Sequence, residues 1–208
     1  MGVLTGSISY TVYHVEDEVP ERYHAEFLER IEEFQFRPLL AEDEDDFSAG
    51  WVRVDDMLRW DFTKDSVFRG PYVLLSLRTD KWSFPAALLR ATVAQRIANF
   101  KEEKGRTRLS KMEREVIRED VRREFKKQML PSVGTVDMAW DVEQGIVRFW
   151  SQSGRAKEQF QELFESTFEV RLHENNPYIA ARSLELTDEE IAALANIEYT
   201  EFGANSGA

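Results

Sequence analysis

The segment from Pro85 to Pro131 constrains the fold more than any other part of this chain. Residues 86–104 predict one helix, which Gly105 interrupts. Ser110, followed three residues later by Glu113, has the capping-box pattern that begins a second helix. Pro131 prevents that second helix from continuing, because proline lacks the N–H that a helix interior requires. We therefore expect two long, consecutive helices here.

The charge of this segment differs from that of the rest of the chain. Residues 101–130 contain eleven Lys or Arg and seven Asp or Glu, a balance of +4, whereas the whole chain of 208 residues carries −12. The remainder therefore carries −16. A chain this acidic is not expected to bind polyanions over its whole surface, but it can bind nucleic acid at a single basic face.

Long cations recur at three or four residues along the second predicted helix, which places them on one side of it: Lys111, Arg114, Arg118, Arg122 and Lys126. Three more precede the helix: Lys104, Arg106 and Arg108. An adjacent apolar stripe is expected to face the core: Ile117, Val121 and Phe125. A rigid row of cations suits phosphate neutralisation. Glu115 and Glu119 leave a second interpretation open, in which the helix is solvent-exposed and its cations form intrahelical salt bridges.

The remaining chain predicts an α+β fold. Alternating or apolar runs predict strands over residues 7–15, 50–54, 60–62, 72–78, 135–141, 146–151 and 170–172. Periodic stretches predict helices over 21–36, 155–168 and 187–195. Strands and helices do not alternate strictly, so we expect a mainly antiparallel sheet with packed helices. Three parts are expected: residues 1–84, residues 85–181, and residues 182–208 with a helix and a loosely ordered tail. Whether the first two parts form one continuous domain is left open.

The sequence offers little support for catalysis. Cysteine is absent, which excludes disulfides and thiol chemistry, and no glycine-rich nucleotide-binding motif occurs. None of the three histidines lies in a metal-binding motif, so we predict no cofactor and no metal; they are His14, His24 and His173. No apolar run approaches the length of a membrane span and no signal peptide is evident, so we expect a cytoplasmic protein.

One group of carboxylates leaves a nuclease interpretation open. Asp137 and Asp141 lie four residues apart on a predicted strand, which places both side chains on one face, and Glu143 is near. Nucleases hold magnesium with clustered acids. The alternative interpretation is a charged rim of the hairpin, and we favour it because no lysine follows at the spacing of such metal sites.

An ordered set of motifs resembles the bacterial recombination-associated RdgC family. The set consists of Pro85 before a helix, EEKGRTRLSKMEREVIREDV at 102–121, MLP at 129–131, Trp140-Asp141, Gly145 before a strand, the stretch from Ser151 to Lys157, and Asn176-Pro177. Phe36-x-Pro38 and Gly50-Trp51-Val52 resemble the beginning of the family sequences. The resemblance covers roughly residues 1–181, and the set as a whole carries it.

This resemblance implies a non-enzymatic protein of the nucleoid that binds DNA without sequence preference and modulates recombination. Proteins of this family form a ring-shaped homodimer around duplex DNA and limit the access of the RecA recombinase, so a relation to RecA would be indirect. The family has also been labelled an exonuclease, without a defined active site. The chain is shorter than other members, which leaves open whether its dimer closes as a ring or stays an open clamp. An acidic protein–protein interaction module is the alternative.

Overall fold

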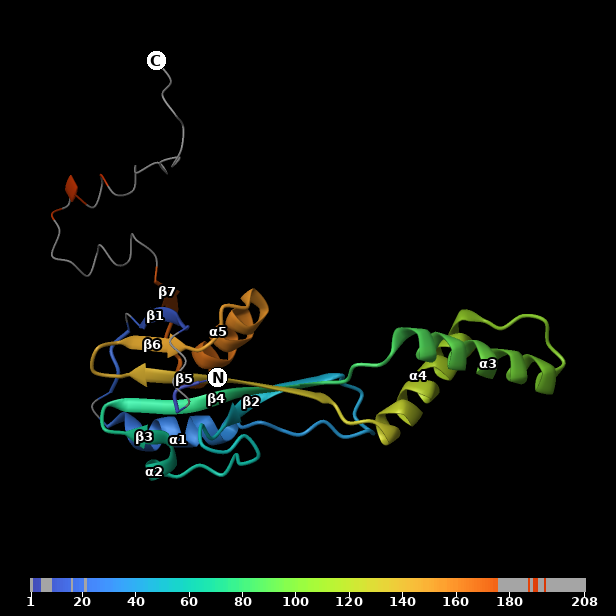
Figure 1. Cartoon of the computed structure of the whole chain (residues 1–208), viewed down its shortest axis with the longest axis horizontal. Helices are drawn as coiled ribbons and strands as arrows, with labels where there is room; N and C mark the ends of the chain where they lie inside the picture. Colours follow the sequence, from blue (N-terminus) through green and yellow to red (C-terminus); the bar gives the residue numbers. More distant parts are fainter. Residues whose placement is uncertain are drawn as a thin grey trace, which may run out of the picture.

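The computed structural model describes residues 2–4, 9–15, 17–20 and 22–175, together with positions 187, 189, 190 and 193. These residues form a sheet covered by helices, and an arm of two helices that projects beyond one end of that sheet (Figure 1). The predicted tail and the Asn176-Pro177 motif lie outside the described residues, as does most of the helix predicted from Thr187.

One antiparallel sheet contains all seven strands of the described residues, which confirms the predicted α+β class with an antiparallel sheet. Their spatial order is β2-β4-β5-β6-β1-β7, and β3 pairs only with β4. The strands are β1 (Thr11–Val15), β2 (Phe47–Val52), β3 (Phe68–Arg69), β4 (Tyr72–Lys81), β5 (Ser132–Asp141), β6 (Ile146–Phe149) and β7 (Leu172–Glu174).

The helices α1 (Tyr23–Glu33) and α5 (Gly154–Phe168) pack on one face of the sheet. Trp140 of β5 contacts Phe27 of α1 at 5.3 Å and Phe164 of α5 at 5.1 Å between ring centroids. The Trp51 indole N–H donates to the Thr167 hydroxyl at 2.8 Å, so its buried polar atom is satisfied. Full burial of each large apolar side chain contributes about 1.5–3 kcal/mol. This core holds the central part of the sheet against the two helices.

The segment between β2 and β4 differs from its prediction. The strand predicted at 60–62 is wrong: Phe62 is buried and Trp60 packs against Phe36 at 5.9 Å, but these residues join no ladder. These apolar side chains pack inward from a loop, so their apolar pattern does not mark a strand. The sequence analysis also missed the short helix α2 (Lys64–Val67), which Thr63 caps by accepting the Ser66 N–H.

Glycine is required at position 50 of β2, where the backbone of residues 35–36 lies against the strand. A Cβ on Gly50 would lie 2.5 Å from the Phe36 Cα and 2.6 Å from its nitrogen. The backbone of residues 34–36 approaches this closely because it hydrogen-bonds to Trp51, with Phe36 N–H donating to the Trp51 carbonyl at 2.9 Å. This contact covers part of the outer edge of β2.

The two arm helices are inserted between the two longest strands. All ten residues of β4 pair with the ten of β5, from Tyr72 with Asp141 to Lys81 with Ser132. Helices α3 (Ala86–Lys104) and α4 (Lys111–Gln128) lie between these strands in the sequence and leave the sheet at one end (Figure 1). We refer to residues 86–128 as the arm.

We expected the apolar stripe of α4 to face the core of the sheet. The structure places it elsewhere. Ile117 and Val121 are buried and α4 packs mainly against α3, so these two residues lie within the arm, whereas Phe125 contacts Phe84, before α3, at 6.2 Å. Helix α3 has no buried residue. None of the helices in the described residues combines the length and the apolar composition of a membrane-spanning helix.

The turn between the arm helices is built as the sequence predicts. Gly105 ends α3 with φ of 61°, a left-handed conformation that suits glycine. The Ser110 hydroxyl accepts the Glu113 N–H at 3.1 Å, and the Glu113 carboxylate accepts the Ser110 N–H at 2.8 Å. The backbone hydrogen bond from Ser110 holds the pKa of Glu113 below its ordinary value of 4.5. This capping box fixes where α4 begins.

We predict that Ser110→Ala loosens the first turn of α4. Loss of an N-cap hydroxyl costs about 1 kcal/mol, so amide hydrogen exchange at residues 111–114 should accelerate several-fold. Because the pKa of Glu113 is lowered in the folded arm, the capping contribution is complete above pH 4.5 and is lost as the pH falls through the folded-state pKa. Thr107→Ala is the control, and equal exchange in both variants would contradict the capping role.

Candidate nucleic-acid interface

Cations from both arm helices gather on one side of the arm. Lys111, Arg114 and Arg118 of α4 line a groove of about 330 Å³. Val93 and Ile97 of α3 line the same groove. Arg118 also borders an adjoining groove of about 420 Å³. We call the cations that line these two grooves the basic face: Arg90, Lys111, Arg114, Arg118 and Arg122.

The α4 part of this face was predicted from the sequence, whereas Arg90 was not. Residues three and four apart stack on one side of a helix, so the row on α4 could be read from spacing alone. Arg90 belongs to α3, and its inclusion depends on which side of α3 lies against α4. The spacing of Leu89, Val93 and Ile97 was the available signal, because an apolar stripe marks the packed side of a helix.

Much of the positive charge near the arm tip is available to a ligand. Among the described residues, no carboxylate forms an ion pair with Arg108, Lys111 or Arg114, and all three side chains are exposed. Arg118 lies 3.6 Å from Glu115, with both side chains 56% exposed. Such exposed pairs contribute little free energy, so a phosphate can displace the carboxylate. The salt-bridged interpretation therefore applies to only part of the predicted row.

Two of the predicted phosphate-binding cations, Arg106 and Lys104, lie on a different part of the arm. Arg106 donates to the Glu113 carboxylate at 2.9 Å, and Glu113 lines a groove on another face of the arm. Lys104 lies 3.8 Å from Glu103, which lines that same groove, and 5.9 Å from the ring centroid of Phe100. Both cations remain exposed, but they do not line the grooves of the basic face.

Lys126 is buried, and its ammonium is bound by the loop before β2. Its side chain is 6% exposed, and its ammonium donates to the Asp43 and Asp45 carbonyls at 2.7 and 3.2 Å. Arg122, at the foot of the basic face, is half-buried and pairs with Asp46. Lys126 therefore leaves the set of proposed phosphate contacts, since its ammonium faces the loop before β2.

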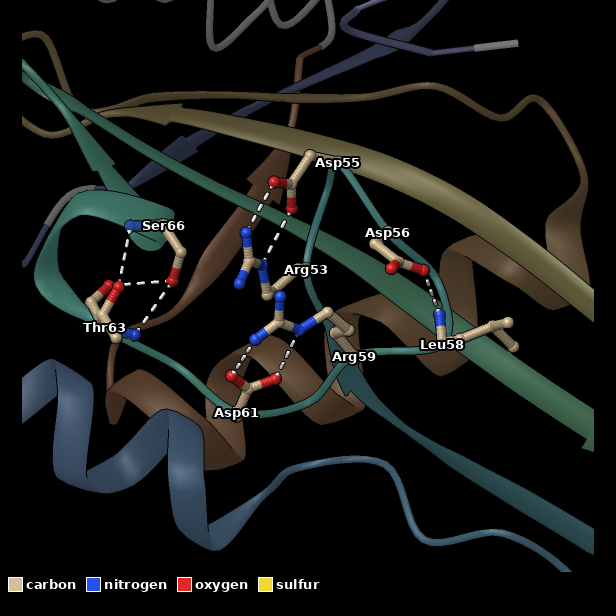
Figure 2. Close-up of polar contacts among 8 residues, drawn as sticks. All are labelled: Arg53, Asp55, Asp56, Leu58, Arg59, Asp61, Thr63 and Ser66. Atoms are coloured by element: carbon tan, nitrogen blue, oxygen red, sulfur yellow. Dashed lines mark hydrogen bonds and ion pairs between the residues drawn. The ribbon is translucent and has the colours of Figure 1, made fainter.

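Three arginines of the sheet region contrast with Lys111 and Arg114 of the arm, because each is held by an aspartate two residues later. Figure 2 shows Arg53 bonded to Asp55, at 2.9 and 2.6 Å, and Arg59 bonded to Asp61, at 3.0 and 2.6 Å. The bond from Arg53 lowers the pKa of the Asp55 carboxyl. A buried pair of the same kind joins Arg78 and Asp80 at 2.8–2.9 Å. These cations are neutralised within the sheet region.

The carboxylates of the nuclease interpretation serve structural contacts. Asp137 accepts the Ser76 hydroxyl at 2.6 Å and the Val3 N–H at 3.0 Å. Asp141 accepts the Gln144 N–H at 3.1 Å and so closes the β5–β6 turn. In the part of the chain that the structure describes, no group of three His, Asp or Glu residues is placed to hold a metal ion. His14 and His173 are neighbours in the β1–β7 ladder, whereas His24 is apart from them and stacks on Tyr23 at 4.2 Å.

The comparison with protein families identifies the family of this chain. A family model described as "RdgC: Putative exonuclease, RdgC" matches residues 9–193 of the 208. No curated protein sequence matches the chain. The match covers the sheet, the whole arm and the cations of the basic face. Because it spans most of the sequence, the chain belongs to the RdgC family, a family of recombination-associated proteins.

Proposed function

We propose that the protein binds double-stranded DNA through the basic face of the arm, without sequence preference, and thereby modulates recombination. The observation that carries this proposal is the position of Lys111, Arg114 and Arg118 along one groove. These cations lie on a rigid helix of a chain whose net charge is −12. The acidic remainder repels DNA, so binding is directed to this face.

The chemistry of the basic face supports binding without sequence preference. Long cations neutralise phosphates, and phosphate contacts carry no sequence information. Aliphatic side chains lie between the cations, and no aromatic side chain lines either groove. Single-strand binders commonly stack bases on aromatic rings, so this face favours the duplex backbone. A protein that covers duplex DNA in this way would limit RecA access indirectly, through occupancy of the DNA.

We predict that the combined variant Lys111→Ala, Arg114→Ala and Arg118→Ala weakens binding to all duplex sequences about equally. Each lost phosphate contact should reduce the slope of log K against log salt by about 0.9. Fluorescence anisotropy with two unrelated duplexes at several salt concentrations measures both effects.

The matched control removes three exposed cations of the sheet region: Arg37→Ala, Lys64→Ala and Arg69→Ala. It changes the net charge by the same amount and should bind as the wild type does. Equal weakening in both variants would contradict a localised site. A wild-type protein that binds no duplex at low salt would favour the acidic protein–protein interaction module.

We also propose that the protein acts as a homodimer, as a ring or an open clamp. An apolar groove of about 490 Å³ on the arm supports this, with Phe100, Met112, Val116 and Ile117 among its lining residues. Met112 is 78% exposed and Val116 is 54% exposed. Exposed apolar surface of this kind marks interaction sites. A second arm placed on this groove would leave the basic faces free for DNA.

A charge placed in this groove should separate the dimer. We predict that sedimentation equilibrium gives the mass of two wild-type chains and of one Val116→Glu chain, because an unpaired buried carboxylate is unfavourable. Lys127→Glu introduces the same side chain at an exposed α4 position outside the groove and should stay dimeric. A wild-type protein with the mass of a single chain would overturn the dimer proposal.

Nuclease activity is the second candidate, because the matching family model carries the description "Putative exonuclease, RdgC". We propose that the protein has no catalytic role, and we predict that linear duplex DNA stays intact when it is incubated with the protein and magnesium. Asp137→Asn tests the alternative, with Ser76→Ala as the control that removes only the neighbouring hydrogen bond. DNA loss that the wild type shows and Asp137→Asn lacks would establish the nuclease interpretation.

A further inference from the structure

Asp46, in the loop before β2, contacts both ends of the arm. Its carbonyl accepts the Trp82 N–H at 2.9 Å, in the linker between β4 and α3. Its carboxylate pairs with Arg122 and lies 3.2 Å from the Lys126 ammonium, and both cations are on the last turns of α4. One residue of the sheet region therefore holds the segments through which the chain enters and leaves the arm.

The Lys126 ammonium makes two hydrogen bonds and one ion pair in this contact. A protonated lysine has three N–H donors and rarely becomes buried unless all are satisfied. Here the acceptors are the Asp43 carbonyl, the Asp45 carbonyl and the Asp46 carboxylate. Because two of these acceptors are backbone atoms, the position of the loop determines the position of α4.

Aromatic packing restrains the linker on the other side. The rings of Trp82 and Phe84 are nearly parallel, with an interplanar angle of 4° and centroids 6.3 Å apart. Phe84 contacts Phe125 of α4 at 6.2 Å, and the Arg122 guanidinium lies 5.4 Å from the Phe84 centroid. The linker before α3 is thus packed against the end of α4.

We propose that Asp46, Arg122 and Lys126 form a lock that fixes the direction in which the arm leaves the sheet. Only two short connections, residues 82–85 and 129–131, join the arm to the strands. Leu130 in the second is 89% exposed, so that connection contributes little packing. Without the lock, the arm would pivot on these connections. Lys126 is therefore a positioning residue, which sets where the basic face lies relative to the sheet.

The absence of cysteine in the chain permits a direct test. Thr107→Cys at the arm tip and Gln144→Cys in the β5–β6 turn provide two exposed positions for spin labels. Labelled protein is diluted with an excess of unlabelled protein, so that pulsed electron paramagnetic resonance measures distances within one chain. We expect one narrow distance peak in this background, and a broadened or shifted peak when Lys126→Met or Asp46→Asn is added.

The exposed neighbours Lys127→Met and Asp45→Asn are the matched controls, and they should keep the narrow peak. Near-ultraviolet circular dichroism verifies that each variant retains its packed aromatic core. Should Lys126→Met fail to fold, Asp46→Asn gives the result, since its side chain is 35% exposed and its backbone contact to Trp82 remains. A narrow, unshifted peak in the folded lock variants would overturn the proposal. The measurement uses no DNA, so it is independent of the DNA-binding proposal.

Discussion

The ladder between β4 and β5 supports the arm, and the rest of the structure depends on it. These strands pair over ten residues each, and the arm occupies the sequence between them. Because the pairing continues to Lys81 and Ser132, the chain enters and leaves the arm from adjacent positions at the end of the sheet. The inner half of the ladder is anchored by the buried side chains of Leu75, Leu77 and Met138 against the helices. A rigid ladder thus carries a helical unit that has few contacts with the core.

Three arginines of the sheet region differ from two cations of the arm in whether a neighbouring carboxylate neutralises them. In the sheet region, Arg53, Arg59 and Arg78 each form a two-point contact with an aspartate two residues later, so their charge is neutralised locally. In the arm, Lys111 and Arg114 form no ion pair with a described carboxylate. The distinction is physical: planar guanidinium pairs leave little charge for a ligand, whereas solvated cations attract phosphate and release counterions. The −12 charge of the chain is therefore compatible with a basic face.

The foot and the tip of α4 serve different purposes although their residues look alike in the sequence. Lys126 continues the row of Lys111, Arg114, Arg118 and Arg122 at helical spacing, yet its ammonium is buried against the loop before β2. Burial follows from the position of this turn beside the sheet, where carbonyl acceptors are within reach. Toward the tip, the same spacing places cations in solvent. A single periodic pattern thus combines an anchor with a surface suited to phosphate.

Local sequence determined the elements whose signals are local. The capping box at Ser110, the left-handed Gly105, the arm helices, the β5–β6 turn and the α4 row all follow from short-range hydrogen bonding and helical spacing. Only the tertiary structure decided that Ile117 and Val121 pack within an arm and that Trp60 and Phe62 join no strand. It also decided that Arg90 borders the basic face. Lys126, finally, is anchored by a loop some 80 residues earlier in the chain. Those outcomes depend on which surfaces meet when distant segments pack, and no spacing within one segment encodes that.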